Sequence, residues 1–536
     1  MTGITVDRAS SVPLYLQITA QIRAAILQGE FENGDRLTPE RRLAALLNVN
    51  RSTVVNAYRE LASEGFVTGH VGRGTVVTYQ RPGDDHADTG TPAASSHGQV
   101  SGASHATRAQ LPWQQLLAPL AGLRHDPLML DAGTVAARQD VIQFTSATPS
   151  PELYPLEQVD AILSEALDTA GQELLQHTPS EGFGPLRDAL ASWMQRQAAG
   201  AGSSVDFDSA RILIASGSQQ ALYLTARALV EPGDLVAIES PTYLGAAQVF
   251  RACGARLLSI PVDRDGMNVD LLSELITRRR PKLIYTLPTF QNPTGSVLAR
   301  DRRHRLLDLA SRYQVPVVED DPYSALRYEG APLPSLLALD HARGGDRVIY
   351  LSTMSKMLFP GFRIGWVSGP RPVLERMTQI KQIVDLDTNA LAQWAVWAFL
   401  SRGLLDEHLE TLRRAYPERL NRMIAGLEAH CGDLITAERP AGGLYLWCRI
   451  ADRLRVRDLL VESAREGVAF APGEPFYLDE PAESGRNTLR LNFTLPSLAE
   501  VDEGTRRLGR AVKRLAEQSA GENGRTPRRR ALTPIV

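Results

Sequence analysis

Apolar residues recur at helical spacing three times within the first 63 positions, and polar residues separate the three stretches. The first stretch follows Pro13-Leu14-Tyr15 and stops at Gln28-Gly29-Glu30, and the third begins near Arg51. The side chains expected to face inward are Ile18, Ile22, Ala25, Ile26, Leu43, Ala44, Leu47, Val54, Val55, Tyr58 and Leu61. This periodicity predicts three amphipathic helices.

The boundaries of the second and third helices carry signals of their own. In Thr38-Pro39-Glu40, the threonine is expected to cap the second helix and the proline to occupy its first turn. Gly65 would end the third helix, after which two β-rich runs, residues 66–68 and 75–78, flank a glycine-containing turn with Arg73. Three helices and a hairpin fit an α+β winged helix-turn-helix, whose third helix enters the DNA major groove and whose hairpin tip reaches the backbone or minor groove.

A second and much larger region begins at about residue 110. Helical patterns there alternate with five short apolar runs, residues 211–214, 235–238, 283–286, 315–318 and 348–351. Each run is continuously apolar, as expected for a strand that is covered on both faces. The pattern predicts an α/β domain with a mainly parallel sheet, and ligand groups are expected where the strands give way to loops.

Residues 80–109 differ from both regions because small and polar residues dominate and Val100 is the single large aliphatic residue. Such a segment buries too little apolar surface to order itself, so we expect a flexible linker with a reach of ~30 Å. The linker separates an N-terminal domain of residues 1–79 from the large domain of residues 110–518. The basic end of the chain, residues 519–536, is expected to be a disordered tail.

Composition narrows the class of protein. The 536 residues are 43% hydrophobic, which suffices for sizeable cores. Three scattered cysteines are too few for a disulfide framework or a thiolate metal site, so reduced thiols and no bound metal are expected. No signal-peptide pattern opens the chain and no apolar run reaches membrane-spanning length, so a cytoplasmic protein without membrane contact is expected. The net charge of -3 requires any nucleic-acid contact to come from a local patch.

Candidate chemistry centres on Lys356, one of only four lysines against 54 arginines. Thr353 and Ser355 precede it, and Arg363 follows seven residues later. This spacing can gather an amine, two hydroxyls and a guanidinium around one phosphorylated carbonyl compound, pyridoxal phosphate. A desolvated amine near other cations becomes nucleophilic enough to form a Schiff base, and a guanidinium suits a phosphate. A lysine in a loop before a glycine-rich strand is the alternative, and the local motif alone does not decide between them.

Further candidate ligand groups follow the predicted strands. Ser216-Gly217-Ser218-Gln219 opens a helix whose free amides can hold a phosphate. Asp320 can keep a pyridine nitrogen protonated, which makes the ring an electron sink, or it can be an ordinary surface acid. Asn292 can donate to a ring hydroxyl or start a turn, and Tyr243 can stack on the ring or pack in the core. Each signal is modest, but their order along the chain leaves little room for coincidence.

A set of residues along the N-terminal domain matches a known DNA-binding family. The matching residues are Pro13-Leu14-Tyr15, Gly34-Asp35-Arg36-Leu37, Glu40-Arg41, Leu43-Ala44, Arg51-Ser52-Thr53-Val54, Leu61, Glu64-Gly65 and Gly72-Arg73-Gly74-Thr75. They resemble the GntR-type winged-helix domain. The resemblance implies binding to a double-stranded DNA operator through Arg41, Arg51, Ser52, Thr53 and Arg73. A winged helix used only for protein contacts is the alternative, which the unbroken pattern disfavours.

The large domain resembles the fold-type I aminotransferases of the pyridoxal phosphate family. The resemblance implies that Lys356 forms a Schiff base with the cofactor and that Asp320 pairs with the pyridine nitrogen. It also implies that Tyr323 and Asn292 hold the ring hydroxyl. In Leu489-Arg490-Leu491-Asn492-Phe493, Arg490 takes the place of the arginine that grips a substrate carboxylate. The residues implied to hold the cofactor phosphate are Gly217, Ser218, Gln219, Thr353, Ser355 and Arg363.

Two positions depart from the aminotransferase pattern. Ala147 stands where the family usually has the glycine whose backbone faces the substrate, so substrate access or fit is expected to differ. His177 replaces the tyrosine that commonly reaches the cofactor phosphate of the partner subunit. Phosphate binding is expected to survive these changes, whereas turnover is less assured.

A GntR-type domain joined to an aminotransferase-like domain resembles the MocR-type transcriptional regulators. The resemblance implies a homodimer that senses pyridoxal phosphate, or its adduct with an amino acid or amine, and binds an operator with two half-sites. The alternatives are an active aminotransferase that carries a DNA-binding arm and a DNA-bound dimer scaffold with a dead ligand site. The intact DNA-binding pattern favours the regulator over the enzyme, and the set of Lys356, Asp320 and Arg363 disfavours the scaffold.

Overall fold

The computed structural model describes residues 4–7, 13–28, 30–31, 33–63, 66–70, 74–79, 127–146, 148–478 and 485–522. The chain divides into two compact units, Met1–Pro119 and Leu120–Val536, and each is described by itself. Several predictions fall outside the described residues, namely the linker of residues 80–109, Gly65 as the end of the third helix, the hairpin turn with Arg73, and the chain after residue 522.

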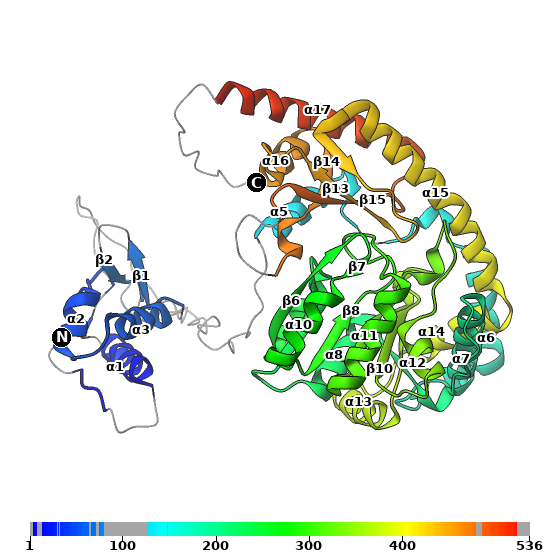
Figure 1. Cartoon of the computed structure of the whole chain (residues 1–536), viewed down its shortest axis with the longest axis horizontal. Helices are drawn as coiled ribbons and strands as arrows, with labels where there is room; N and C mark the ends of the chain where they lie inside the picture. The colour runs from blue at the N-terminus through cyan, green and yellow to red at the C-terminus, as the bar shows by residue number, and fades with distance from the viewer. Residues whose placement is uncertain are drawn as a thin grey trace, which may run out of the picture. The chain divides into compact units, whose positions relative to one another are not determined.

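In its described residues, the N-terminal unit consists of three helices and a two-stranded antiparallel sheet (Figure 1). The elements are α1 (Leu14–Gln28), α2 (Glu40–Leu46), α3 (Arg51–Ser63), β1 (Val67–His70) and β2 (Gly74–Val77). The buried core residues are Ile18, Ile22, Ile26, Leu37, Leu43, Ala44, Val54, Ala57, Tyr58, Leu61, Val67 and Val77. The predicted order of three helices followed by a hairpin is confirmed.

Two details of this unit differ from the prediction. The N-cap residue of α2 is Pro39, which makes no side-chain cap bond, so the expectation that Thr38 caps this helix was wrong. The carbonyl oxygen of Thr38 instead accepts a hydrogen bond from the Tyr58 hydroxyl at 2.6 Å. Val55 and Ala25 were expected to face inward but are half-buried, whereas Ala57 is fully buried. The packing of α3 against α1 therefore selects a slightly rotated face of the helix.

The described large unit contains an eight-stranded sheet in the order β4-β11-β10-β9-β8-β5-β6-β7. These strands are β4 (Ile212–Ala215), β5 (Leu235–Ser240), β6 (Arg256–Asp263), β7 (Gly266–Met267), β8 (Leu283–Thr286), β9 (Val317–Asp320), β10 (Val348–Thr353) and β11 (Gly365–Ser368). Six strands run parallel, whereas β11 and β7 are antiparallel to their neighbours. All five predicted apolar runs overlap strands of this sheet, and β4, β8, β9 and β10 are buried throughout. The predicted mainly parallel sheet is confirmed.

Helices surround this sheet, and both α8 and α12 pack against β10 (Figure 1). The α-helices are α5 (Pro127–Ala136), α6 (Leu156–Leu174), α7 (Gly184–Gly200), α8 (Ser218–Leu229), α9 (Leu244–Ala252), α10 (Val269–Arg279), α11 (Arg300–Tyr313), α12 (Leu336–Ala342), α13 (Arg371–Val384), α14 (Ala390–Ser401), α15 (Leu404–Cys431), α16 (Val456–Arg465) and α17 (Leu498–Glu522). Short 3-10 helices are Pro151–Leu153, Ser209–Arg211, Ser324–Leu326, Pro360–Phe362, Gly432–Leu434 and Glu474–Phe476.

A second sheet, which the sequence analysis did not identify, has the order β12-β13-β15-β14-β3. Its strands are β3 (Ile142–Phe144), β12 (Ile435–Ala437), β13 (Tyr445–Ile450), β14 (Val468–Pro472) and β15 (Thr488–Asn492). Figure 1 shows α15, α16 and α17 beside it. The last helix, α17, continues to Glu522, four residues beyond the predicted domain end at residue 518. In the described part of the chain, no helix combines the length and apolar composition needed to span a bilayer.

Candidate functional site

The parallel strands end at one edge of the large sheet, and the loops after them carry the predicted site residues. Lys356 lies three residues after β10 and is half-buried. Burial, together with the positive charges of Arg490 and Arg363, lowers the pKa of the Lys356 amine to about 8. Asp320 opposes this shift. The lowered pKa raises the fraction of neutral amine, which is the form that attacks a carbonyl.

Asp320 is the last residue of β9 and is only 4% exposed, so the alternative of an ordinary surface acid was wrong. Its Oδ2 atom accepts a hydrogen bond from the Tyr285 hydroxyl at 2.7 Å. Its Oδ1 atom is buried and has no hydrogen-bond partner among the described residues. Burial raises the pKa of Asp320 to about 7, although the Tyr285 hydrogen bond acts in the opposite direction. The protonated nitrogen of a pyridine ring would supply the donor that Oδ1 lacks, so this residue fits pyridoxal phosphate.

Arg363 contacts the turn between β4 and α8. The Arg363 Nη2 atom donates to the Ser216 carbonyl at 3.2 Å, and Nη1 lies 3.5 Å from the Ser355 hydroxyl. Gly217 has a φ of +90°, and a Cβ atom added there would fall 2.5 Å from Arg363 Nη2. Only glycine combines that conformation with the space that the guanidinium needs.

Hydroxyl groups complete this group of donors. The Thr353 hydroxyl donates to the Ser355 hydroxyl at 3.0 Å, and it accepts from the Ser355 backbone N–H at 3.1 Å. Ser218 is the first residue of α8, where backbone N–H groups are available to an anion. We call the set of Gly217, Ser218, Thr353, Ser355 and Arg363 the phosphate cup, and Ser216 is the residue directly before it. The donors and positive charge of the cup suit a phosphate monoester.

Gln219 and Tyr243 are linked to each other beside the cup. The Tyr243 hydroxyl donates to the Gln219 side-chain oxygen at 2.9 Å, and Gln219 Nε2 donates to the Gly245 carbonyl at 3.3 Å. Tyr243 is half-buried. Burial and the charge of Asp320 raise the pKa of Tyr243 to about 12, so its hydroxyl remains a donor at neutral pH.

Arg490, on β15, adds a second guanidinium to the site and is 7% exposed. Its Nη1 atom donates to Asn292 Oδ1 at 2.7 Å, and Nη2 donates to the Thr145 carbonyl at 3.1 Å. The guanidinium carbon stands 4.1 Å from the centre of the Tyr445 ring and 5.0 Å from that of Phe476. Its buried Nε atom has no hydrogen-bond partner among the described residues. An aromatic-lined guanidinium with an available donor suits a carboxylate.

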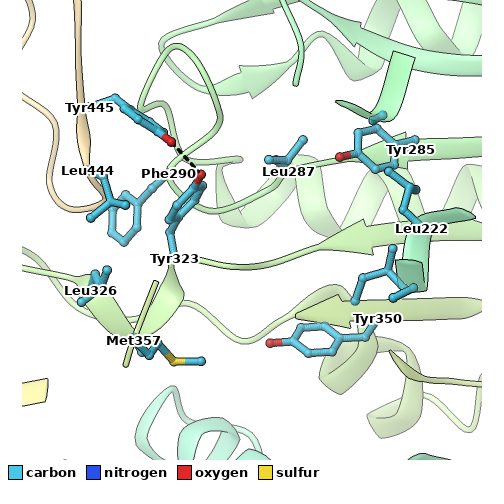
Figure 2. Packing of buried hydrophobic residues seen from close by; sticks show 14 of the residues in the cluster. Leu222, Tyr285, Leu287, Phe290, Tyr323, Leu326, Tyr350, Met357, Leu444 and Tyr445 are labelled. Carbon is cyan, nitrogen blue, oxygen red and sulfur yellow. Dashed lines mark hydrogen bonds between the residues drawn. The ribbon is translucent and has the colours of Figure 1, made fainter. Parts of the chain in front are cut away.

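Tyr323 is buried, and its hydroxyl lies 3.2 Å from that of Tyr445 (Figure 2). The two rings meet edge to face with their centroids 5.8 Å apart. Figure 2 shows Tyr323 and Tyr445 pointing toward each other, with Phe290 close to them. Sequence reasoning missed Tyr445 and Tyr285, because each contacts a residue from a distant segment. The glycine pair before β13 was the one local signal for Tyr445.

Three further buried carboxylates anchor the loops around the site. Glu239 accepts hydrogen bonds from Gln291 Nε2 and the Leu287 N–H, both at 3.2 Å. Glu319 and Asp321 flank Asp320 and bond to backbone N–H groups of the following segments. Burial raises the pKa values of Glu239 and Glu319 to about 7 and raises that of Asp321. The site is thus fixed by polar groups that have little access to water.

The two residues that depart from the family pattern have different outcomes. Ala147 lies outside the described residues. The side chain of His177 is 81% exposed, and its Nδ1 atom is 2.7 Å from Asp387 Oδ2. Leu175 and Leu386, close to this pair in sequence, are also exposed. The His177–Asp387 pair and the exposed side chains of Leu175 and Leu386 therefore lie close together on the surface of the large unit.

In the N-terminal unit, the predicted DNA-binding residues lie on α2 and at the start of α3. Arg41 is exposed, and the Arg51 side chain is 55% exposed. Arg51 Nη2 is 2.9 Å from Glu40 Oε2, which fixes the guanidinium at the N-terminal end of α3. Thr53 is half-buried. The side chain of Ser52 and the whole of Arg73 lie outside the described parts.

Comparisons with known proteins match both units. The family "Bacterial regulatory proteins, gntR family" matches residues 14–77, and the family "Aminotransferase class I and II" matches residues 150–508. A solved structure of LysN, the alpha-aminoadipate aminotransferase from Thermus thermophilus complexed with N-(5'-phosphopyridoxyl)-L-leucine, is 35% identical with a TM-score of 0.69. It covers 76% of this chain and 100% of that chain.

Two relatives extend over almost the whole chain. The uncharacterized HTH-type transcriptional regulator YisV of Bacillus subtilis is 32% identical over 509 residues, which are 95% of this chain and 98% of that protein. The probable rhizopine catabolism regulatory protein MocR of Rhizobium meliloti is 29% identical over 528 residues, 98% of each chain. Because both families match in this order and the similarity runs through both units, the chain belongs to the MocR-type transcriptional regulators, which join a GntR-type winged-helix domain to a fold-type I aminotransferase domain.

Proposed function

We propose that this protein is a transcriptional regulator in which the winged-helix unit binds an operator and the aminotransferase-like unit senses pyridoxal phosphate or its adduct with an amino compound. One observation carries the proposal: the Lys356 amine, the buried Asp320 carboxylate and the phosphate cup lie in one site. The same chain also has a GntR-type unit. Binding to chromosomal DNA would place the protein in the cytoplasm, as predicted.

The site residues take distinct roles toward the cofactor. When bound, pyridoxal phosphate supplies an aldehyde that can attach to an amine and a ring that accepts electrons. Lys356 would provide that amine, and Asp320 would accept a hydrogen bond from the ring nitrogen. The phosphate cup and Gln219 would bind the phosphate, and Tyr243 would stack on the ring. Tyr323 and the side-chain N–H group of Asn292 would hold the ring hydroxyl.

The effector proposed for this site is an amino acid or amine. Arg490 favours an amino acid, because its partly available guanidinium can bind a carboxylate and because its charge acts on Lys356 across the same site. An amine without a carboxylate would leave the Arg490 interaction unused. An amino acid should therefore bind more tightly than the amine formed by removing its carboxyl group.

We also propose a homodimer that binds two half-sites. The exposed apolar residues Leu175 and Leu386, together with the His177–Asp387 pair, support a protein contact on this face of the large unit. A two-fold dimer would carry two winged-helix units, and each would read one half of the operator.

The direct test is footprinting of the operator with protein depleted of cofactor, with pyridoxal phosphate added back, and with the Lys356→Ala variant. A regulator that senses the cofactor should change its protected region or its affinity when pyridoxal phosphate is added, and the variant should respond less. Identical footprints and affinities in all three states would contradict sensing. Absence of sequence-selective protection would contradict operator binding.

An active aminotransferase with a DNA-binding arm is the second candidate, and Arg490 is the observation that favours it. The position of this arginine matches the one that grips a substrate carboxylate in aminotransferases. Incubation with amino acids and a 2-oxo acid, followed by measurement of the new amino acid, tests the activity. Fast turnover combined with cofactor-independent DNA binding would favour the enzyme, whereas slow turnover is compatible with a regulator.

A further inference from the structure

A fully buried lysine is linked through one carboxylate to the residues next to the phosphate cup. It is not one of the proposed cofactor contacts. Lys381, on α13, is 0% exposed, and its Nζ atom is 2.8 Å from Asp385 Oδ1. A buried ammonium needs a paired charge, because loss of hydration strongly disfavours the charged form. Asp385 supplies this charge from the end of the same helix.

The second oxygen of Asp385 reaches Gln220 and Ser216, which lie next to the phosphate cup. Asp385 Oδ2 accepts a hydrogen bond from Gln220 Nε2 at 2.6 Å and from the Ser216 hydroxyl at 3.2 Å. The Gln220 side-chain oxygen accepts from the Ser216 backbone N–H at 2.7 Å. One carboxylate therefore joins α13, the first turn of α8 and the residue before Gly217.

Ser216 is consequently held at three of its polar groups. Its N–H group is bound by Gln220, its hydroxyl by Asp385 and its carbonyl by Arg363. The following residue, Gly217, has a left-handed backbone and lies against the same guanidinium. A shift of Ser216 would therefore move both the backbone donors of the cup and Arg363.

We propose that Asp385, neutralised by Lys381, is a positioning residue for the phosphate cup and sets how strongly the cup holds the phosphate of the cofactor. It acts through Ser216 and Gln220 and does not contact the phosphate itself. This inference rests on the proposed cofactor site and adds residues from α13 to it. Supporting groups of this kind orient the donors that contact a ligand, and their removal weakens binding without removing a contact.

The experiment compares pyridoxal phosphate with pyridoxal, which lacks only the phosphate group. Dissociation constants are measured by quenching of tryptophan fluorescence in the full-length, cofactor-depleted protein. Asp385→Asn should weaken binding of pyridoxal phosphate about tenfold, because an amide holds Ser216 and Gln220 less firmly than a carboxylate does, and should change pyridoxal binding by less than about twofold. Glu375→Gln, which removes an exposed partner of Arg371 on the same helix, is the matched control and should leave both constants unchanged.

Asp385→Asn leaves the Lys381 ammonium buried without its charge partner, which is a destabilising change. The double variant Lys381→Met/Asp385→Asn removes both charges together, and Ser216→Ala removes only the hydroxyl contact to Asp385. These variants should also lower the preference for the phosphorylated ligand, and Ser216→Ala should have the smallest effect. An unchanged preference in any folded variant that lacks Asp385 would overturn the inference. A native protein that binds both ligands equally would instead contradict the proposed phosphate site.

Discussion

At the scale of single residues, the same burial shifts two pKa values in opposite directions. The Asp320 carboxyl and the Lys356 amine both lose contact with water, so both charged forms are disfavoured and their pKa values approach each other, at about 7 and about 8. The two side chains also attract each other, which limits both shifts. Without a ligand, the site therefore holds a carboxyl group whose charged form a protonated ring nitrogen can stabilise, and an amine that is partly neutral near pH 8.

Asp320 should make the cofactor-depleted protein less stable as the pH rises. Its pKa is higher in the folded state, at about 7, than the usual 3.8, so the folded state binds more protons between these values and loses stability across this window as the pH increases. Asp320→Asn removes the titration and should be more stable than the native protein at pH 8, by on the order of a few kcal/mol, but not below about pH 4. The measurement is denaturant unfolding followed by tryptophan fluorescence, since residues 1–79 contain no tryptophan.

The Asp320→Asn variant should also bind pyridoxal phosphate more weakly, because an amide is a poorer partner than a carboxylate for a protonated ring nitrogen. A parallel loss of stability and cofactor affinity at pH 8 would instead indicate that Asp320 has a purely structural role.

Lys356 should be responsible for a visible absorption band of the protein with pyridoxal phosphate. Its lowered pKa supplies the neutral amine, so formation of the band should accelerate as the pH rises through about 8. Lys356→Ala should lose the band, whereas Lys282→Ala, which changes an exposed lysine, should keep it. A band of unchanged position and strength in Lys356→Ala would show that the cofactor is attached elsewhere.

At the scale of elements, continuous apolar runs predicted strands of the large sheet. Strands that pair across distant parts of the chain were not predicted. The strands β8 and β10 begin at the predicted residues because buried parallel strands have no polar face to obscure the pattern. The second sheet joins β3, which begins at Ile142, to β14, which begins at Val468. Nothing local in either segment specifies a partner more than 300 residues away. Local patterns cannot supply such a pairing.

The same limit applied to the site. Lys356 and Asp320 were visible in the sequence because each has a local motif beside a strand. Tyr285 and Asp385 were not, because their roles arise from contacts with residues 35 and 169 positions away, respectively. Sequence thus predicted the groups proposed to touch the ligand better than the groups that hold them in place.

Helix α3, which is predicted to be the recognition helix, and the preceding helix α2 should read DNA in different ways. Arg51 lies at the N-terminal end of α3, where the Glu40 contact holds its guanidinium, so it suits a bidentate contact to a base edge. Arg51→Ala should relax sequence preference by ~1–3 kcal/mol, whereas Arg41→Ala should weaken all sites alike through a lost phosphate contact. Binding to the operator and to single-base variants measures both. Equal and uniform losses from the two substitutions would contradict these roles.

At the scale of the whole molecule, function requires the ligand site and the DNA-binding unit to influence each other. An effector shifts an equilibrium only if it binds two states with different affinity. A linker of about 30 residues with a reach of ~30 Å would allow several spacings of paired half-sites. Docking of the winged-helix units by the large domains would restrict these spacings. We therefore expect the ligand to change the relative geometry of the two winged-helix units more than the DNA affinity of either unit alone.

Cofactor attachment at Lys356, or effector binding at Arg490, should thus change affinity for paired half-sites far more than affinity for one half-site. The two DNAs are titrated with cofactor-loaded protein, cofactor-depleted protein and Lys356→Ala at one fixed salt concentration, because phosphate contacts make affinity strongly salt-dependent. Paired sites should distinguish loaded from depleted protein, and Lys356→Ala should behave as depleted. Equal cofactor effects on single and paired sites would mean that the ligand acts on each winged-helix unit separately, since dimer geometry cannot alter binding to a single half-site.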